Sequence, residues 1–133
     1  MSTPAAQLPI ILIVDDDPEA LILLRRLLLS ITHSCEIVVA ENGVGALALT
    51  AVRPVALVIT DFYMPGMNGV QLTSAIKAAS PTTRVAIITA YDVHDVARRA
   101  KAVAADYVLP KPLKLAQLEQ MLEESLPITE SDE

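Results

Sequence analysis

The chain is poor in aromatic residues and in cysteine. Of its 133 residues, one is Phe, three are Tyr and none is Trp, so base stacking on single-stranded nucleic acid is not expected. Cys35 is the single cysteine, which excludes an internal disulfide, a CxxC redox pair and a cysteine-rich zinc site. This cysteine usage fits a reducing compartment, and we expect the protein in the cytoplasm.

Positive charge and long apolar runs are also scarce. Ten Lys and Arg against sixteen Asp and Glu give a formal net charge of −6, and no basic patch offsets the repulsion of nucleic-acid phosphates. The longest apolar stretch, residues 8–14, falls far below the ~18 residues of a membrane span, and the start lacks the basic segment of a signal peptide. We therefore expect neither a nucleic acid nor a membrane as a partner.

Aliphatic residues make up most of the 53% hydrophobic content. Short β-branched runs, at residues 10–14, 35–40, 56–60, 84–89 and 107–109, alternate with stretches of helical period at residues 18–30, 43–52, 70–79, 93–103 and 115–126. Three of the short runs are apolar on both faces, as strands covered by helices on each side are. The alternation predicts an α/β domain with a parallel sheet.

Length and local signals indicate one domain over residues 1–133, with a core of about 8–126 and flexible ends at 1–9 and 129–133. Pro18 suits the first turn of a helix, and Asn42 suits a helix N-cap. On a helical wheel, the first helix has a core-facing arc made of Leu21, Leu23, Leu24, Leu27, Leu28 and Ile31. On the last helix, the residues expected to face the core are Leu115, Leu118, Met121, Leu122 and Leu126.

Polar residues follow the strands at the sheet edge where open α/β folds bind ligands. They are Asp15 and Asp16 after the first strand, Asp61 at the end of the third, Thr89 at the end of the fourth and Lys111 just after the fifth. Three clustered carboxylates repel one another by several kcal/mol at an effective dielectric of ~20, so a countercharge is required. A divalent ion together with Lys111 supplies it, and oxygen-only ligands favour Mg²⁺. Taken alone, the Asp run before Pro18 can also be a turn and helix cap.

Four segments carry a resemblance to a known family. IILIVDDDP, VITDFYMPGMNG, IITAY and LPKPL, in this order and spacing, resemble the receiver domain of two-component response regulators. The resemblance runs from about residue 8 to residue 126. It implies a flavodoxin-like, doubly wound sheet of five parallel strands in the order 2-1-3-4-5 with five helices.

The resemblance also implies roles for individual residues. Asp61 is the phosphoacceptor, Thr89 and Lys111 contact the phosphoryl group, and the Lys111–Pro112 peptide bond is cis. Mg²⁺, for which Mn²⁺ can substitute, is held by Asp16 directly, by Asp15 mainly through water, by Asp61 and by the backbone carbonyl of Tyr63.

The implied function is a signalling module rather than an enzyme, apart from its own phosphorylation and dephosphorylation. A histidine kinase or phosphotransfer protein donates the phosphoryl group, and the output passes to a downstream protein target through protein contacts. Ile22 and Leu29 lie outside the core-facing arc beside Arg25 and Arg26, so we expect these four residues to contact a partner. A homodimer is compatible with the sequence. Because seven residues follow Leu126, we expect no DNA-binding module after the domain.

Two features depart from the family pattern or modify it. The family's aromatic switch position, three residues before Lys111, is Val108, and Tyr107 is displaced by one residue to the opposite face of a strand. Either the strand carries a bulge, or the usual switch is absent or moved to other residues; we expect its absence. Tyr63 and Tyr91 occupy two positions that border the pocket in the family. Their rings either slow the loss of the phosphoryl group or simply cover the rim of the pocket.

Three alternatives remain open at this stage. A phosphatase of the haloacid dehalogenase type needs a second acid where this chain has Tyr63. A flavodoxin-like cofactor binder needs hydroxyl groups where this chain has Asp15 to Asp17. A receiver-like interaction module that acts without phosphorylation is compatible with the unusual fifth strand. His33 and His94 are expected to be ordinary loop or helix-end residues, and Cys35 a small buried apolar residue.

Overall fold

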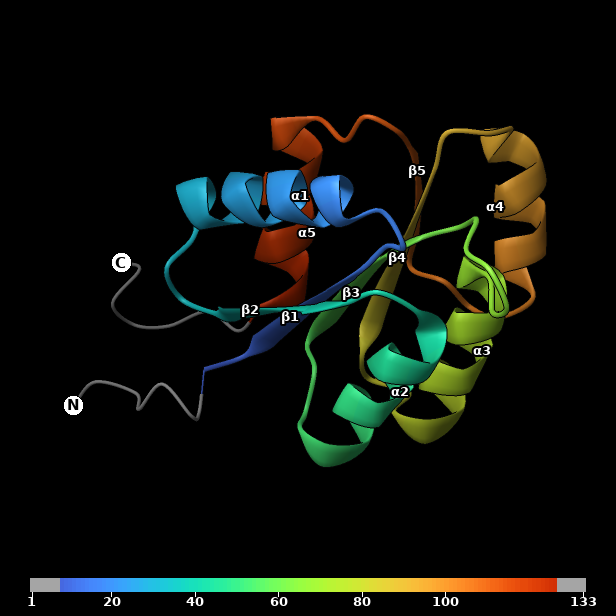
Figure 1. The fold of residues 1–133 in the computed structure, drawn as a ribbon, viewed down its shortest axis with the longest axis horizontal. Helices are drawn as coiled ribbons and strands as arrows, with labels where there is room; N and C mark the ends of the chain where they lie inside the picture. Colours follow the sequence, from blue (N-terminus) through green and yellow to red (C-terminus); the bar gives the residue numbers. More distant parts are fainter. Residues whose placement is uncertain (1–7, 127–133) are drawn as a thin grey trace.

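The computed structural model describes residues 8–126, which form a five-stranded parallel sheet covered by helices on both faces (Figure 1). In chain order the elements are β1 (Ile10–Val14), α1 (Pro18–Ile31), β2 (Glu36–Ala40), α2 (Gly43–Val52), β3 (Leu57–Asp61), α3 (Gly69–Ala79), β4 (Arg84–Thr89), α4 (Val93–Lys101), β5 (Tyr107–Pro110) and α5 (Leu115–Ser125). The strands lie in the order β2-β1-β3-β4-β5 and all pair in parallel. The predicted fold class is confirmed.

The sheet is most deeply buried at its centre. Every residue of β1 and β3 is buried, whereas the outer strands β2 and β5 are largely half-buried. Helices α1 and α5 cover one face, and α2, α3 and α4 cover the other (Figure 1). Two aliphatic layers result, because side chains alternate along each strand. The central strands read as continuous apolar runs for this reason.

The fifth strand is regular and carries no bulge. Tyr107 is in register with Ala86, and Val108 is in register with Ile87. Val108 packs against the core below α2, α3 and α4, and Tyr107 packs against the core below α1 and α5. The bulge alternative is therefore wrong, and the aromatic ring lies on the face opposite to the position that Val108 occupies.

The helix starts follow from local chemistry. Pro18 is in the first turn of α1, and the Asp17 side chain caps that helix by accepting from the Glu19 N–H at 3.0 Å. The Asn42 side chain accepts from the Gly45 N–H at 2.8 Å and caps α2. These starts agree with the sequence-based positions.

Two leucines predicted to face the core do not do so. Leu23 is 62% exposed and Leu115 is 46% exposed. Helix α1 lies over the side of the sheet next to the outer strand, so only Leu21 and Leu28, one heptad apart, are fully covered. Leu115 is the first residue of α5, and the buried residues of this helix, Leu118, Met121 and Leu122, come at least three positions later.

The ends predicted to be flexible fall mostly outside the described residues. Within the described range, Pro9 already takes part in the sheet, because its carbonyl accepts from the Glu36 N–H at 2.9 Å. Between residues 8 and 126, no helix combines the length and apolar character needed to cross a bilayer.

Candidate functional site

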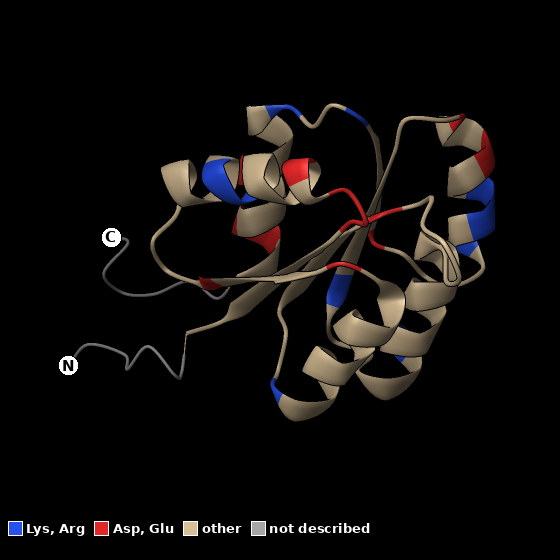
Figure 2. Ribbon diagram, viewed as in Figure 1, with Lys and Arg blue, Asp and Glu red and all other residues tan. Residues whose placement is uncertain are grey.

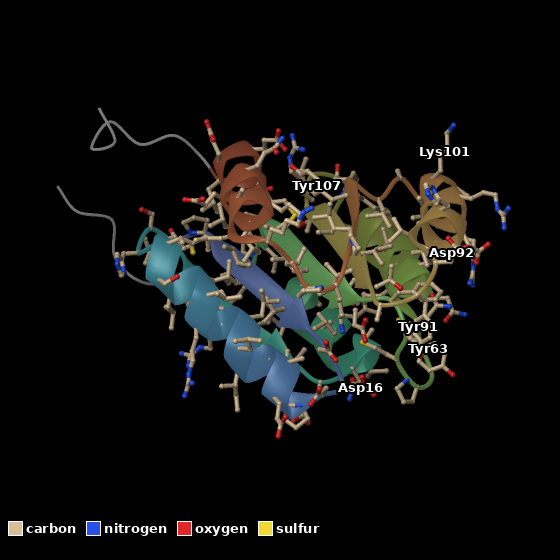
Figure 3. The ribbon with its side chains drawn as sticks, turned by 90° about the horizontal axis from the view of Figure 1, so that it is seen from above. Asp16, Tyr63, Tyr91, Asp92, Lys101 and Tyr107 are labelled. Atoms are coloured by element: carbon tan, nitrogen blue, oxygen red, sulfur yellow. The ribbon has the colours of Figure 1, made fainter. Side chains whose placement is uncertain are left out.

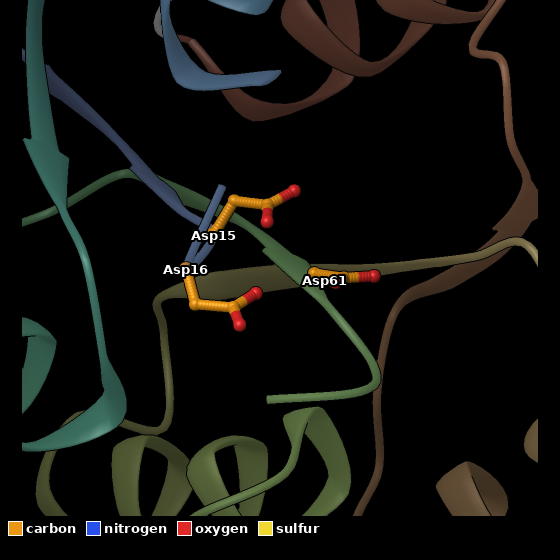
Figure 4. Close-up of side chains that lie close together, drawn as sticks. All are labelled: Asp15, Asp16 and Asp61. Atoms are coloured by element: carbon orange, nitrogen blue, oxygen red, sulfur yellow. The ribbon is translucent and has the colours of Figure 1, made fainter. Parts of the chain in front are cut away.

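The three consecutive aspartates after β1 have separate tasks. Asp17 caps α1. Asp15 is 5% exposed and accepts from the Asp17 N–H at 3.0 Å, which fixes its carboxylate at the strand end. Asp16 is exposed, and its carboxylate points toward the same space as that of Asp15 (Figure 4). The cap interpretation therefore applies to Asp17, while Asp15 and Asp16 are available for other chemistry.

Asp61 completes an acidic cluster with Asp15 and Asp16 at the carboxyl ends of β1 and β3 (Figures 2 and 4). One carboxylate oxygen from each residue lies within 4.8 Å of the others. The Lys111 Nζ lies 3.2 Å from an oxygen of Asp15 and 3.2 Å from an oxygen of Asp61. The structure thus brings together the carboxylates and the lysine that the sequence places at different strand ends.

Burial and charge act against each other in this cluster. Burial raises the pKa of the Asp61 carboxyl group above its ordinary value, the ammonium of Lys111 lowers it, and the carboxylates of Asp15 and Asp16 raise it. Burial also acts to lower the pKa of Lys111, but Asp61 and Asp15 outweigh this effect and raise it. The single lysine does not neutralise three carboxylates, so the formal charge of the cluster remains −2 when all are ionised.

This donor set fits a small hard cation. Three carboxylate oxygens within mutual reach, partly buried and undercompensated in charge, are what Mg²⁺ binds, and the exposed side at Asp16 leaves room for the water molecules that this ion retains. Among the described residues, no His or Cys belongs to the cluster.

Thr89 is fixed by hydrogen bonds to the segment that follows it and to Lys111. Its side chain is buried, and its hydroxyl accepts from the Tyr91 N–H at 2.9 Å. The Thr89 carbonyl accepts from the Lys111 N–H at 2.8 Å, and the Lys111–Pro112 peptide bond is cis. Because Asp61 is in register with Ile88, the residue before Thr89, the hydroxyl and the carboxylate belong to adjacent strand ends.

The loop after Asp61 depends on two glycines. Gly66 has a φ of +83°, a region that residues with a Cβ rarely adopt. A Cβ added to Gly69 would lie 2.7 Å from the Asp61 carbonyl oxygen and 3.0 Å from the Phe62 Cα. Gly69 therefore lets α3 start directly against the Asp61 backbone. The sequence indicated turns here but not this close approach.

Tyr63 and Tyr91 form an exposed aromatic pair at the rim of the site. Their ring centroids are 5.7 Å apart with an interplanar angle of 51°, and both side chains project on the side of the molecule where Asp16 lies (Figure 3). They are 65% and 64% exposed. Figure 3 also shows Tyr107 far from this pair, beside α5.

Helix α1 borders two grooves. One, of about 370 Å³, adjoins the acidic cluster; it is lined by Asp15 and Lys111 and by apolar side chains that include Leu23, Leu24, Leu27 and Leu113. The other lies on the opposite side of the helix, along β2, and includes Ile22 and Arg25. The four expected partner contacts, Ile22, Arg25, Arg26 and Leu29, are all exposed. The groove next to the acids was missed, because a helical wheel does not show which flank of α1 faces the β5–α5 connection.

The remaining singled-out residues lie elsewhere. His33 is in the connection between α1 and β2, and His94 is in the first turn of α4, both exposed. Cys35 is half-buried just before β2, and burial raises the pKa of its thiol.

Known proteins share both the sequence pattern and the fold. The family model of the response regulator receiver domain matches residues 11–123. A two-component response regulator of Arabidopsis thaliana, ARR17, is 34% identical over 125 residues, which cover 84% of this chain and 80% of that protein. A transcriptional regulatory protein of Klebsiella oxytoca, ZraR, is 36% identical over 124 residues, which cover 92% of this chain and 27% of that protein.

The chain covers a still smaller share of a cyclic di-GMP phosphodiesterase of Thermotoga maritima. That protein is 37% identical over 82 residues, which are 62% of this chain and 22% of the phosphodiesterase. Among solved structures, a receiver domain protein from Clostridium thermocellum superposes with a TM-score of 0.80 at 27% identity, covering 89% of this chain and 94% of that one. The chemotaxis protein CheY4 of Vibrio cholerae gives a TM-score of 0.79 at 26% identity, covering 90% and 99%. The chain belongs to the receiver domain family of two-component response regulators.

Proposed function

We propose that Asp61 accepts a phosphoryl group from a histidine kinase or phosphotransfer protein, that Mg²⁺ assists, and that the aspartyl phosphate changes the contacts of the domain with a downstream protein. The observation that carries the proposal is the position of Lys111, 3.2 Å from both Asp15 and Asp61 inside a cluster that is left with excess negative charge. A static ion pair does not need two further carboxylates, whereas phosphoryl transfer needs a nucleophile and countercharges in one place.

The chemistry assigns a task to each group. An oxygen of the Asp61 carboxylate forms a bond to phosphorus, and the bond from phosphorus to the donor breaks with its electron pair leaving on the donor atom. The Lys111 ammonium, already 3.2 Å from Asp61, meets one phosphoryl oxygen. The Thr89 hydroxyl, which now accepts from Tyr91, donates to another. Most of the catalysis is positioning and charge stabilisation.

Asp15, Asp16, Asp61 and the Tyr63 carbonyl would hold the Mg²⁺. When bound, the ion reduces the repulsion between the carboxylate and the incoming anion. The burial of Asp15 and Asp61 at 5% and 9% exposure limits screening by water, so each charge in the site acts strongly on its neighbours.

Acetyl phosphate and intact-mass measurement test the acceptor. With Mg²⁺, the wild type should gain the mass of one phosphoryl group, and Asp61→Asn should gain none. Asp17→Asn is a matched control, because Asp17 is adjacent in sequence but serves as a helix cap, a task that Asn performs equally well. Modification of Asp61→Asn to the wild-type extent, or loss of modification in Asp17→Asn, would contradict the assignment.

The phosphodonor should dock on the flank of α1 that adjoins the acids. Its phosphorylated group must come within bonding distance of Asp61, and the groove lined by Leu23 and Leu113 opens directly beside Asp15 and Lys111. An apolar groove of this kind accepts the apolar face of an amphipathic helix. The four exposed residues Ile22, Arg25, Arg26 and Leu29 remain proposed contacts on the outer surface of the same helix.

A charge placed in this groove separates docking from chemistry. Leu23→Glu should slow phosphotransfer from a cognate protein donor and leave phosphorylation by acetyl phosphate unchanged. Leu115→Glu is the control, since Leu115 is also an exposed leucine, on α5. Equal transfer rates for both variants would contradict docking at this groove, and an unimpaired Ile22→Glu, Leu29→Glu double variant would remove the outer residues from the contact.

Tyr63 and Tyr91 should slow hydrolysis of the aspartyl phosphate. We expect their rings, which pair at the rim, to restrict the approach of water to the group on Asp61. The Tyr63→Ala, Tyr91→Ala double variant should therefore have a shorter phosphoryl half-life than the wild type, measured by loss of the added mass after the donor is removed. A half-life that is not shortened would contradict a role of the rings in slowing hydrolysis and would favour the alternative that they only cover the rim.

Val108 favours one alternative. Because the usual aromatic position holds a small aliphatic side chain packed into the core, a module that binds its partner without phosphorylation stays a second candidate. Equal partner affinity of wild type and Asp61→Asn in the presence of acetyl phosphate would favour it.

A further inference from the structure

Along one side of the outer strand β2, the backbone hydrogen-bonding groups have no partner within residues 8–126. The Glu36 N–H donates to the Pro9 carbonyl at 2.9 Å, and the Ala40 carbonyl accepts from the Asp15 N–H at 3.2 Å. Alternate residues of a strand direct their backbone groups to the same side, so Ile37 and Val39 direct theirs away from β1. Among the described residues, none hydrogen bonds to these groups.

The strand lacks three of the features that protect a sheet edge: Pro, Lys and a β-bulge. Edge strands are usually interrupted by Pro, Lys, bulges or inward-pointing charge. All five residues of β2 pair one-to-one with β1, without a bulge. Its single charged residue, Glu36, is neutralised by the Arg53 guanidinium, with contacts of 2.8 and 3.1 Å. Figure 2 shows charge only at the ends of this ribbon. The opposite edge strand, β5, by contrast ends in Pro110.

Beside this edge runs the groove of about 550 Å³ between β2 and α1. Val39 on its floor is 43% exposed, and Ile22 on its wall is 54% exposed. Arg25 and Glu41 also line it, and neither takes part in an ion pair with the described part of the chain. The edge therefore combines open hydrogen-bonding groups, apolar surface and one charge of each sign.

We propose that β2 pairs with β2 of a second copy of this chain, antiparallel across a twofold axis at Val38. Ile37 then lies opposite Val39 of the other copy, and each of these pairs exchanges both backbone hydrogen bonds. Glu36 lies opposite Ala40, and Glu41 lies opposite Cys35, so no carboxylate faces its own copy. The Glu41 end of each strand enters the groove that the other copy lines with Arg25. A second copy satisfies both halves at once, because a twofold contact uses the same surface twice and closes.

The test is the mass of the full chain in solution from micromolar to millimolar concentration, by analytical ultracentrifugation. The wild type should pass from monomer to dimer, and Val39→Lys should raise the dimer dissociation constant at least about tenfold, because the new ammonium is carried into the contact. Leu115→Lys, at a similarly exposed position on α5, should dimerise as the wild type does. Asp61→Asn should also dimerise, since this contact does not depend on phosphorylation.

Amide hydrogen exchange locates the contact. The amides of Ile37 and Val39 should become protected as concentration rises, while the Val38 amide, which faces β1, should be protected throughout. A wild type that stays monomeric up to millimolar concentration would overturn the proposal. This holds even if the edge instead binds a strand of another protein. A dimer with equal dissociation constants for Val39→Lys and Leu115→Lys, or with unprotected Ile37 and Val39 amides, would overturn it as well.

Discussion

Replacement of Asp61 by Asn should stabilise the protein when Mg²⁺ is removed. The carboxylate oxygens of the cluster lie within 4.8 Å of one another, so at an effective dielectric of ~20 each neighbouring carboxylate repels that of Asp61 by about 3.5 kcal/mol. Lys111, at 3.2 Å, attracts it by about 5 kcal/mol under the same assumption. Two repulsions exceed one attraction, and water at the exposed Asp16 screens part of the difference.

The net gain from the substitution is about 1–2 kcal/mol in the free energy of unfolding. Burial acts in the same direction: it is the main cause of the raised pKa of Asp61, so the folded state disfavours the carboxylate compared with the unfolded chain. At about 4 °C per kcal/mol for a domain of this size, Tm should rise by about 4–8 °C in the presence of a chelator.

Thermal unfolding with EDTA and with saturating Mg²⁺ measures both halves of the prediction. Mg²⁺ should raise the Tm of the wild type by more than that of Asp61→Asn, because the variant has lost one ligand and bound ion stabilises the folded state in proportion to affinity. Asp17→Asn should match the wild type in both buffers. A variant less stable than the wild type in EDTA, or an equal Mg²⁺ response of the two, would refute the electrostatic reasoning.

Three further changes have defined outcomes. Gly69→Ala should destabilise the fold by about 1–3 kcal/mol in denaturant titrations and slow phosphorylation by acetyl phosphate, because the added Cβ would lie 2.7 Å from the Asp61 carbonyl oxygen. Gly45→Ala is the control: its Cβ would meet nothing closer than 3.4 Å, so this variant should be neutral or stabilising. Ala104→Gly should stabilise by up to about 1 kcal/mol, since Ala104 has a φ of +60°, and an unchanged unfolding midpoint would contradict this. Burial, and after it the hydrogen bond to Glu124, raises the pKa of Tyr107 above its ordinary value. The free energy of unfolding should therefore fall as pH rises through the ordinary tyrosine pKa. Glu124→Gln should bring the titration of Tyr107, followed by ultraviolet absorbance, closer to that ordinary value.

The strands and the acidic cluster could be predicted because their signals are local. Continuous apolar runs identify β1, β3 and β4, and each polar residue of the site lies at the end of a strand or within two residues after it. Parallel strands bring their carboxyl ends to one edge, so the meeting of Asp15, Asp61 and Lys111 follows from the topology.

Features that depend on tertiary packing could not be predicted in this way. Leu23 and Leu24 are adjacent leucines of one helix, yet Leu23 is exposed and Leu24 is half-buried, and both line the groove beside Asp15 and Lys111. The requirement for Gly69 arises from the Asp61 carbonyl oxygen, which comes close only after α3 packs against β3. The face of Tyr107 depended on whether β5 had a bulge, which periodicity in a four-residue strand does not reveal.

Lys111, the countercharge of the acidic cluster, follows an outer strand of the sheet, and we expect a change at Asp61 to act there first. Asp15 and Asp16 follow β1 and Asp61 ends β3, two strands that are fully buried, whereas Lys111 follows the largely half-buried edge strand β5. The Lys111 N–H is bonded to the Thr89 carbonyl, and the Thr89 hydroxyl is bonded to the Tyr91 N–H. We therefore expect a change in charge at Asp61 to act through Lys111 on the half-buried edge strand β5 and, through Thr89, on the segment that carries the exposed Tyr91.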